Sequence, residues 1–167
     1  MAERLKVGDK VIYPAHGAGV IEAIEQKVLS GNEQTVYVMK MLHKGMTILV
    51  PLDNVESVGI RNPISVKEIE GVYEVLKKRD LPSTEPVETW NRRYRHYKEK
   101  INTGSILEIA GVLSRLHQRR KTGALSLGEK RLVDTAMDLL VGEVWCAENT
   151  KEGMIRREIQ HSGTRTA

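Results

Sequence analysis

Hydrophobic and polar positions follow two different patterns along the chain, one before and one after residue 63. Residues 5–60 contain short β-branched or aromatic runs separated by glycine, proline and turn residues, which is typical of strands. The clearest runs are residues 35–42 and residues 46–51, and the second ends in Pro51. Because proline cannot donate to a sheet ladder, Pro51 indicates an edge strand or a strand end. This density of short strands predicts a small, strongly bent β-barrel of the SH3 or Tudor type.

From residue 65 onward, apolar residues recur every three or four positions, as in amphipathic helices. A further helix is expected between Thr89 and Gly104, and the proline-containing segment Leu81–Pro86 is expected to be a loop. Three Ser-x-x-Glu sequences precede helical stretches and predict capping boxes. They are Ser65 with Glu68, Ser105 with Glu108, and Ser126 with Glu129.

These patterns predict an α+β chain of two domains. We expect the small β-barrel to span residues 1–62 and an all-α helical bundle to span residues 65–150. The short segment Arg61–Pro63 would join them. Residues 151–167 lose the apolar spacing and are expected to form a frayed C-terminal tail.

Composition narrows the class of protein. Of the 167 residues, 40% are hydrophobic and 29% are charged, and no apolar run reaches the about 18–20 residues that a membrane helix needs. The first residues lack the apolar stretch of a secretory signal, and the single Cys146 cannot form an internal disulfide. We therefore expect a cytoplasmic protein that does not associate with membranes.

Enzyme motifs are missing from the sequence. It contains no phosphate-binding G-x-x-x-x-G-K-[ST], no G-x-S-x-G and no H-E-x-x-H. The five histidines and the one cysteine do not have the spacing of metal ligands. We therefore expect no catalytic residue, metal, cofactor or small-molecule substrate.

Charge is distributed unevenly. The net charge is +4, and residues 1–62 contain 7 basic and 7 acidic residues, so the whole excess lies in the second part. One basic cluster lies within residues 91–100 and another within residues 115–121. A basic domain suggests an anionic partner such as nucleic acid, although charged runs can simply be solvated helix faces.

Aromatic residues gather in the first of these basic clusters. Trp90, Tyr94, Tyr97 and Ile101 fall on one stripe of the expected helix. For the last three, burial in the domain core is the favoured interpretation. Trp90 lies in the first turn, where its side chain can extend past the helix end. An apolar wedge beside arginines is the arrangement that minor-groove binding proteins use to separate stacked base pairs.

The apolar strand at residues 46–51 has two interpretations. It can be closed within the barrel, or it can offer free backbone groups to a strand of a partner. In the second case Lys27 and Lys40 would flank an acidic or mixed partner surface.

The sequence resembles a known family in both halves. Its N-terminal part resembles the RNA-polymerase-interaction domain shared by CarD-like regulators and transcription–repair coupling factors, and its helical part resembles the CarD/CdnL family alone. The N-terminal resemblance rests on residues 7–14 (VGDKVIYP), 16–20 (HGAGV), 50–51 (VP) and 58–61 (VGIR), and the second on residues 90–95 (WNRRYR) and 125–131 (LSLGEKR).

The resemblance implies a bacterial transcription regulator that is not an enzyme. In the family, the Tudor-like domain docks on the RNA polymerase β subunit, partly by extending a β-sheet. The helical domain meets promoter DNA at the upstream edge of the bubble, with its tryptophan in the minor groove and largely without sequence readout. Together these contacts stabilise the open promoter complex and would place the protein at the nucleoid.

A competing hypothesis is a non-enzymatic adaptor between two proteins that makes no DNA contact.

Residue roles carried over from the family complete the prediction. Some family members have arginine at the position of Leu49 and others have an apolar residue, so we expect an apolar or backbone contact there and not an ionic one. The DNA-binding residues would be Trp90, Arg92, Arg93, Arg95 and Lys98, and the polymerase-binding residues would be Lys27, Lys40, Met46, Ile48, Leu49 and Pro51.

Overall fold

The computed structural model describes residues 4–78, 90–148 and 152–164. The chain divides into two compact units, Met1–Pro63 and Ile64–Ala167. The expected loop Leu81–Pro86 lies outside the described residues. Within the described residues, no helix combines the length and the apolar character needed to cross a membrane.

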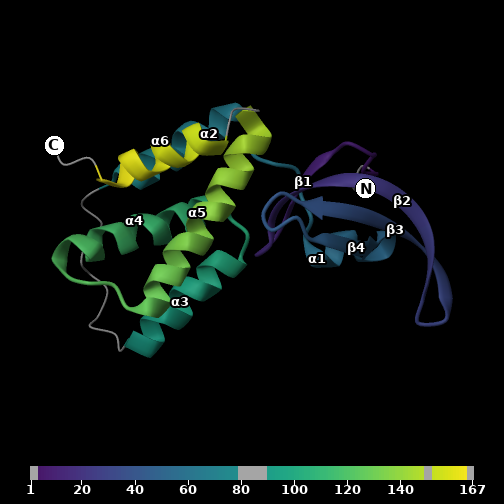
Figure 1. Ribbon diagram of the computed structural model, residues 1–167, viewed down its shortest axis with the longest axis horizontal. Coiled ribbons are helices and arrows are strands. Elements are labelled where there is room, and N and C mark those ends of the chain that lie inside the picture. Colours follow the sequence, from purple (N-terminus) through teal and green to yellow (C-terminus); the bar gives the residue numbers. More distant parts are fainter. Residues whose placement is uncertain (1–3, 79–89, 149–151, 165–167) are drawn as a thin grey trace. The chain divides into compact units, whose positions relative to one another are not determined.

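The N-terminal unit is an antiparallel sheet with strand order β1-β2-β3-β4. The sheet curls into a half-barrel, which confirms the bent β-domain expected from the sequence (Figure 1). A short 3₁₀ turn η1 and a short helix α1 follow β4. The elements are β1 Lys10–Tyr13, β2 Gly17–Leu29, β3 Asn32–Met41, β4 Thr47–Pro51, η1 Leu52–Asn54 and α1 Val55–Val58.

The core of this unit is formed by side chains on one face of the sheet, which are every second residue along a strand. On β3, Tyr37, Met39 and Met41 occupy every second position and are buried, as expected for one face of a strand. Gly19 on β2 is packed closely against β3, because a Cβ atom there would lie 3.0 Å from Sδ of Met41. Strand β2 runs through Gly19 without a break.

The two edges of the sheet differ. At the β1 edge, the backbone N–H of Ile12 donates to the carbonyl of Arg61 at 2.8 Å, and the N–H of Arg61 donates back at 3.1 Å. The outer edge of β4 has no strand paired to it among the described residues. Of the two edges, β4 is thus the one left open to a further strand.

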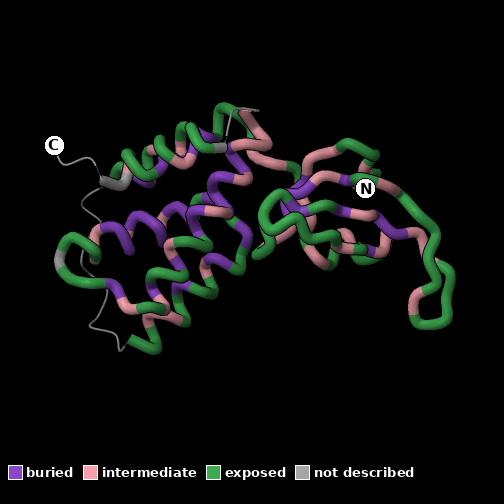
Figure 2. Tube along the Cα trace, in the orientation of Figure 1, coloured by how far each residue is buried: buried purple, intermediate pink, exposed green. Residues whose placement is uncertain are grey.

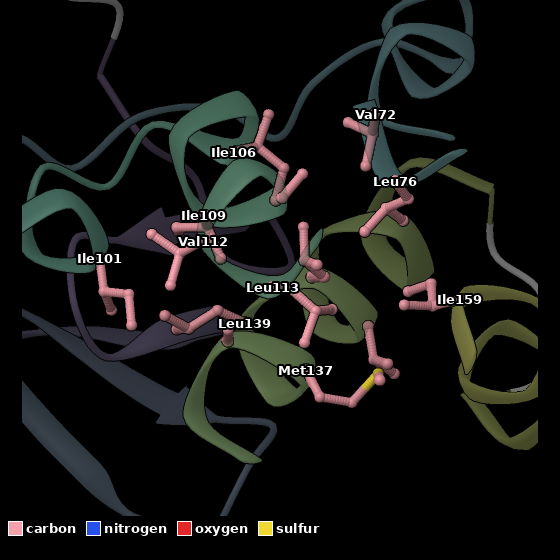
Figure 3. Packing of buried hydrophobic residues seen from close by; sticks show 14 of the residues in the cluster. Val72, Leu76, Ile101, Ile106, Ile109, Val112, Leu113, Met137, Leu139 and Ile159 are labelled. Atoms are coloured by element: carbon pink, nitrogen blue, oxygen red, sulfur yellow. The ribbon is translucent and has the colours of Figure 1, made fainter. Parts of the chain in front are cut away.

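The described residues of the second unit form a bundle of five helices, and the expected all-α fold is confirmed. All five contribute side chains to its core, and the most deeply buried segments belong to α4 and α5 (Figure 2). The helices are α2 Val66–Lys77, α3 Trp90–Asn102, α4 Ile106–Thr122, α5 Leu127–Glu148 and α6 Glu152–Thr164. Figure 3 shows core side chains from every helix, among them Leu76, Ile101, Leu113, Met137 and Ile159.

Two of the three expected capping boxes form. Ser65 and Glu68 exchange both bonds at the start of α2. Ser126 and Glu129 do so at the start of α5, with N···O distances of 3.0 and 3.2 Å. The box at Ser105 does not form, because the Ser105 side chain makes no cap bond.

The C-terminal segment differs from the frayed tail expected for residues 151–167. Glu152–Thr164 is helix α6, and its Ile155 and Ile159 are 1% and 0% exposed in the bundle core. Arg156 also donates to Asp138 of α5 at 2.8 Å. Few apolar residues mark this helix in the sequence, but the two at spacing i, i+4 are enough to attach it to the bundle.

Candidate functional site

Trp90 begins α3 and remains partly open to solvent. Its side chain is 44% exposed, whereas Tyr97 and Ile101, further along the same stripe, are 2% and 3% exposed. One face of the indole stacks on Tyr94, with ring centroids 5.5 Å apart and planes 19° apart. The stripe expected from the sequence therefore has a buried end and an exposed end, and Trp90 is the exposed end.

The start of α5 contacts the edge of this indole. Nε1 of Trp90 donates a hydrogen bond to Oγ of Ser126 at 3.0 Å. A Cβ atom at Gly128 would lie 3.2 Å from the indole of Trp90 and 3.2 Å from the ring of Tyr94. The tryptophan is consequently fixed in position although almost half of it is exposed.

A buried carboxylate lies directly behind this contact. The Glu129 side chain is 3% exposed, and its Oε1 lies 3.5 Å from Arg93 Nη2 and 3.4 Å from Arg119 Nε. Its Oε2 accepts the backbone N–H of Ser126. One carboxylate thus lies within ion-pair distance of arginines from α3 and α4, and its other oxygen caps α5.

The other predicted DNA-binding cations face solvent. Arg92, Arg95 and Lys98 are exposed and, within the described part of the chain, form no ion pair. Their spacing i, i+3, i+6 places them along one ridge of α3. Arg93 differs from these three, because only 19% of its side chain is exposed and it is paired with Glu129.

The arrangement combines an exposed aromatic edge with a row of unpaired cations. Exposed cations attract phosphates through a long-range, salt-dependent interaction. A fixed, half-exposed indole can pack against an apolar surface or between bases without first losing much rotational freedom. The region defined by Trp90, Arg92, Arg95 and Lys98 is therefore the candidate nucleic-acid interface.

Strand β4 supplies a second candidate interface. The N–H of Met41 donates to the carbonyl of Met46 at 2.8 Å, so this pair is hydrogen-bonded. Bonded and non-bonded pairs alternate along antiparallel strands, so Ile48 bonds to β3, whereas the backbone N–H and C=O of Thr47 and Leu49 point to the open edge. This edge can accept a strand from a partner.

Side chains around the open edge are mostly apolar. Met46 and Leu49 are 47% and 40% exposed, whereas Ile48 packs on the core of the β-unit. Pro51 ends the strand and is partly exposed. The structure thus brings four of the six predicted polymerase-binding residues together along one strand and the turn before it.

The other two predicted polymerase-binding residues are Lys27 on β2 and Lys40 on β3. Lys27 is paired with Glu25 at 3.3 Å, and Lys40 is paired with Glu22 at 3.8 Å. Both lysines are exposed, and surface pairs of this kind are weak. Lys40 is opposite Thr47 in the β3–β4 register, whereas Lys27 lies in the hairpin beyond the part that pairs with β4.

Sequence reasoning missed the contacts that connect α3 to α5. Ser126 and Glu129 were recognised as a capping pair, but nothing local in the sequence connects them to Trp90 or Arg93, which lie 36 positions earlier. Gly128 was seen only as part of a resembling motif. Among the described side chains, no three His, Cys, Asp or Glu residues are placed to hold a metal ion.

Comparison with known proteins gives the family of the chain. Residues 5–64 match the CarD-like/TRCF RID domain, and residues 71–160 match the CarD C-terminal domain. YdeB of Bacillus subtilis (strain 168), named as a candidate transcription factor, is 32% identical over 151 residues, which cover 90% of this chain and 97% of YdeB.

Two solved structures resemble parts of the chain. CdnLNt from Myxococcus xanthus is 42% identical, with 39% of this chain and 92% of that chain covered and a TM-score of 0.33. The N-terminal domain of Myxococcus xanthus CarD is 32% identical, with 37% and 83% covered and a TM-score of 0.32. From the two domain matches and the full-length relative, we conclude that the chain belongs to the CarD family, as a non-enzymatic CarD-like transcription factor with an RNA polymerase-interacting domain followed by a CarD C-terminal domain.

Proposed function

We propose that this protein stabilises the open promoter complex. The N-terminal unit binds the RNA polymerase β subunit, and the helical unit contacts promoter DNA at the upstream edge of the bubble, with Trp90 in the minor groove. The protein then acts in the cytoplasm, at the nucleoid. The observation that carries the proposal is the fixed, 44% exposed indole of Trp90 beside the exposed cations of α3.

On the DNA side, Arg92, Arg95 and Lys98 contact phosphates. Their ridge is free of ion pairs within the described residues, so no intramolecular bond has to break before they bind. Three such contacts give weak binding that is insensitive to sequence and falls with salt. Arg93 reaches a phosphate only by leaving Glu129, and Arg119 would remain with that carboxylate.

On the polymerase side, the open edge of β4 pairs with a strand of the β subunit. The outward backbone groups of Thr47 and Leu49 provide the hydrogen bonds, and the exposed side chain of Leu49 provides an apolar contact. Lys27, Lys40, Met46, Ile48 and Pro51 support or flank this contact.

Docking on polymerase explains how a weak DNA binder can act at one place. Tethering raises the local concentration of the helical unit at the promoter, so sequence readout is unnecessary. Unstacking a base step costs a few kcal/mol. A wedge that fits the opened junction better than closed duplex shifts the equilibrium toward the open complex by the difference in its two affinities.

The competing function is an adaptor that joins polymerase to an acidic protein and does not touch DNA. The open β4 edge serves that role equally well, so the two hypotheses differ only at α3. In the adaptor, the α3 cations would be solvated or would meet acidic side chains, and Trp90 would contact protein.

A footprint of the polymerase–promoter complex distinguishes them. The proposal predicts protection of the upstream bubble edge that weakens with salt and is lost in the Arg92→Gln/Arg95→Gln variant. The matched control is Lys67→Gln/Arg157→Gln, which removes the same charge from exposed positions on α2 and α6. If the natural chain adds no protection at the upstream bubble edge beyond that of polymerase alone, the result would favour the adaptor.

A further inference from the structure

We infer that Ser126, Gly128 and Glu129, at the start of α5, are positioning residues that hold the Trp90 indole in its wedge orientation. The inference rests on the proposed function for its consequence at the promoter, and its structural part can be tested without DNA. It adds to the DNA-contacting residues a group of residues that act through Trp90.

The Ser126 hydroxyl oxygen accepts two hydrogen bonds at the same time. Its Oγ accepts the backbone N–H of Glu129 at 3.2 Å, which caps α5, and it accepts Nε1–H of Trp90 at 3.0 Å. A hydroxyl oxygen has two acceptor lone pairs, so both bonds can exist together. The orientation of the indole is thereby linked to the cap of the longest helix in the described structure.

Glu129 keeps Ser126 in place. Its Oε2 accepts the Ser126 N–H at 3.0 Å, and Oε1 faces Arg93 and Arg119. Arg93 lies three residues after Trp90 on α3, so the same carboxylate ties the first turn of α3 to the first turn of α5. This second link fixes the distance between the indole and its acceptor.

Gly128 sets how closely the indole approaches α5. A Cβ at this position would lie 3.2 Å from Cζ2 of Trp90 and 3.2 Å from Cε2 of Tyr94, which is closer than ordinary van der Waals contact. Any larger residue would have to push the stacked pair of rings outward. The indole is therefore held by stacking on one face, by a hydrogen bond at Nε1, and by a close approach to the Gly128 backbone.

Holding the side chain in advance lowers the entropy lost when it enters DNA. A freely rotating Trp90 would have to be ordered at the moment of insertion, and only part of its population would be ready to insert. Loss of one hydrogen bond of this kind is worth about 0.5–1.5 kcal/mol, which corresponds to a two- to tenfold change.

The test uses the full chain and two readouts. The first is the indole N–H cross-peak of Trp90 in ¹H–¹⁵N spectra, assigned by its absence from Trp90→Phe, together with its heteronuclear NOE. The second is the lifetime of open complexes formed with polymerase. Ser126→Ala is compared with Ser65→Ala, which removes the equivalent capping hydroxyl from α2, where the cap is formed in the same way.

A second pair of variants separates indole position from helix stability. Gly128→Ala brings a Cβ into the ring pair, whereas Gly111→Ala in α4 meets nothing within 4 Å. Both changes replace a helical glycine by alanine, and only the change at Gly128 crowds the two rings. Differences between them therefore report on Trp90.

We expect Ser126→Ala and Gly128→Ala to move the Trp90 cross-peak, Ser126→Ala to lower its NOE, and both to shorten open-complex lifetime about two- to tenfold relative to their controls. The inference is overturned if the Trp90 cross-peak stays in place. It is also overturned if the lifetimes match those of the control variants while Trp90→Ala shortens the lifetime. An unchanged lifetime in Trp90→Ala would instead contradict the proposed function, and the cross-peak would still report whether α5 holds the indole.

Discussion

The guanidinium of Arg93 lies 3.5 Å from the buried carboxylate of Glu129, although the two residues are 36 positions apart. This pairing separates Arg93 from its neighbours on α3. The sequence presents four cations that look equivalent, at positions 92, 93, 95 and 98, and the structure gives one of them an internal partner.

Replacing Arg93 by Gln should destabilise the helical unit, whereas Arg92→Gln should not. Arg93→Gln leaves the 3% exposed Glu129 with only one of its two arginines, and we expect the free energy of unfolding to fall by about 1–3 kcal/mol. Arg92 is exposed, so its replacement should change that free energy by less than about 0.5 kcal/mol. Urea unfolding measures both. Equal effects of the two substitutions would contradict the pairing.

Leu49→Glu should weaken binding to RNA polymerase by at least about tenfold, a loss of about 1.4 kcal/mol. The substitution places a charge on the exposed side chain beside the open edge of β4. Val7→Glu is the control, because Val7 is 60% exposed but precedes β1, the strand at the opposite edge of the sheet. Binding of the full chains to polymerase, followed by interferometry, would show whether the loss is specific to Leu49.

Leu49→Pro separates a backbone contact from a side-chain contact. The Leu49 N–H points to the open edge, so proline removes a donor for the partner without removing a bond to β3. We expect the folded sheet to persist, as judged by circular dichroism, and polymerase affinity to fall. Unchanged affinity together with an intact sheet would show that the partner does not pair with this edge.

Helix α6 should contribute strongly to stability. Ile159 is 0% exposed, and Ile159→Ala is expected to lower the free energy of unfolding by about 2–5 kcal/mol through lost burial and the cavity left behind. Met154 on the same helix is 54% exposed, so Met154→Ala should cost less than about 0.5 kcal/mol. Similar values for the two variants in thermal or urea unfolding would mean that α6 does not pack into the core.

The helical unit should lose stability as the solution becomes acidic. Burial lowers the pKa of His117 below its ordinary 6.5, and the charges of Arg120 and Lys121 lower it further. The unfolded chain therefore binds a proton on His117 more readily than the folded chain does. This contribution to the free energy of unfolding is full above pH 6.5 and is lost as pH falls from there through the lowered, folded-state pKa.

Two histidine variants test the assignment. His117→Phe should reduce the slope of unfolding free energy against pH in this window, and His96→Gln, at an exposed position of α3, should leave it unchanged. Asp134, Arg156 and His161 line the same cavity as His117, and none of them is changed in either variant. A slope in His117→Phe equal to that of the natural chain would contradict the assignment.

Local patterns were sufficient for most of the fold. The β-branched and aromatic run at residues 35–42 predicted β3, and the Ser65 and Ser126 capping boxes marked the starts of α2 and α5 correctly. Helix α6 was not predicted, because it is attached through Ile155 and Ile159, and their burial depends on the packing of the other helices. Long-range packing, and not local helix propensity, therefore determines whether α6 forms.

The candidate site was predictable to a similar extent. Trp90 was singled out from its place at the head of a basic helix, and the structure leaves it half exposed. The Ser126 bond to its indole and the Glu129 pairing of Arg93 join residues far apart in sequence. A single sequence carries no local mark of such contacts, so only the folded structure could show them.

The lifetime of open promoter complexes with Trp90→Ala tests the central claim most directly. Complexes are formed with natural or variant protein and polymerase, then challenged with a competitor that traps released polymerase. The account predicts that Trp90→Ala binds polymerase normally, keeps its fold and shortens the lifetime on several promoters toward the value without the protein. Lifetimes equal to those with the natural chain, at equal polymerase binding, would contradict it.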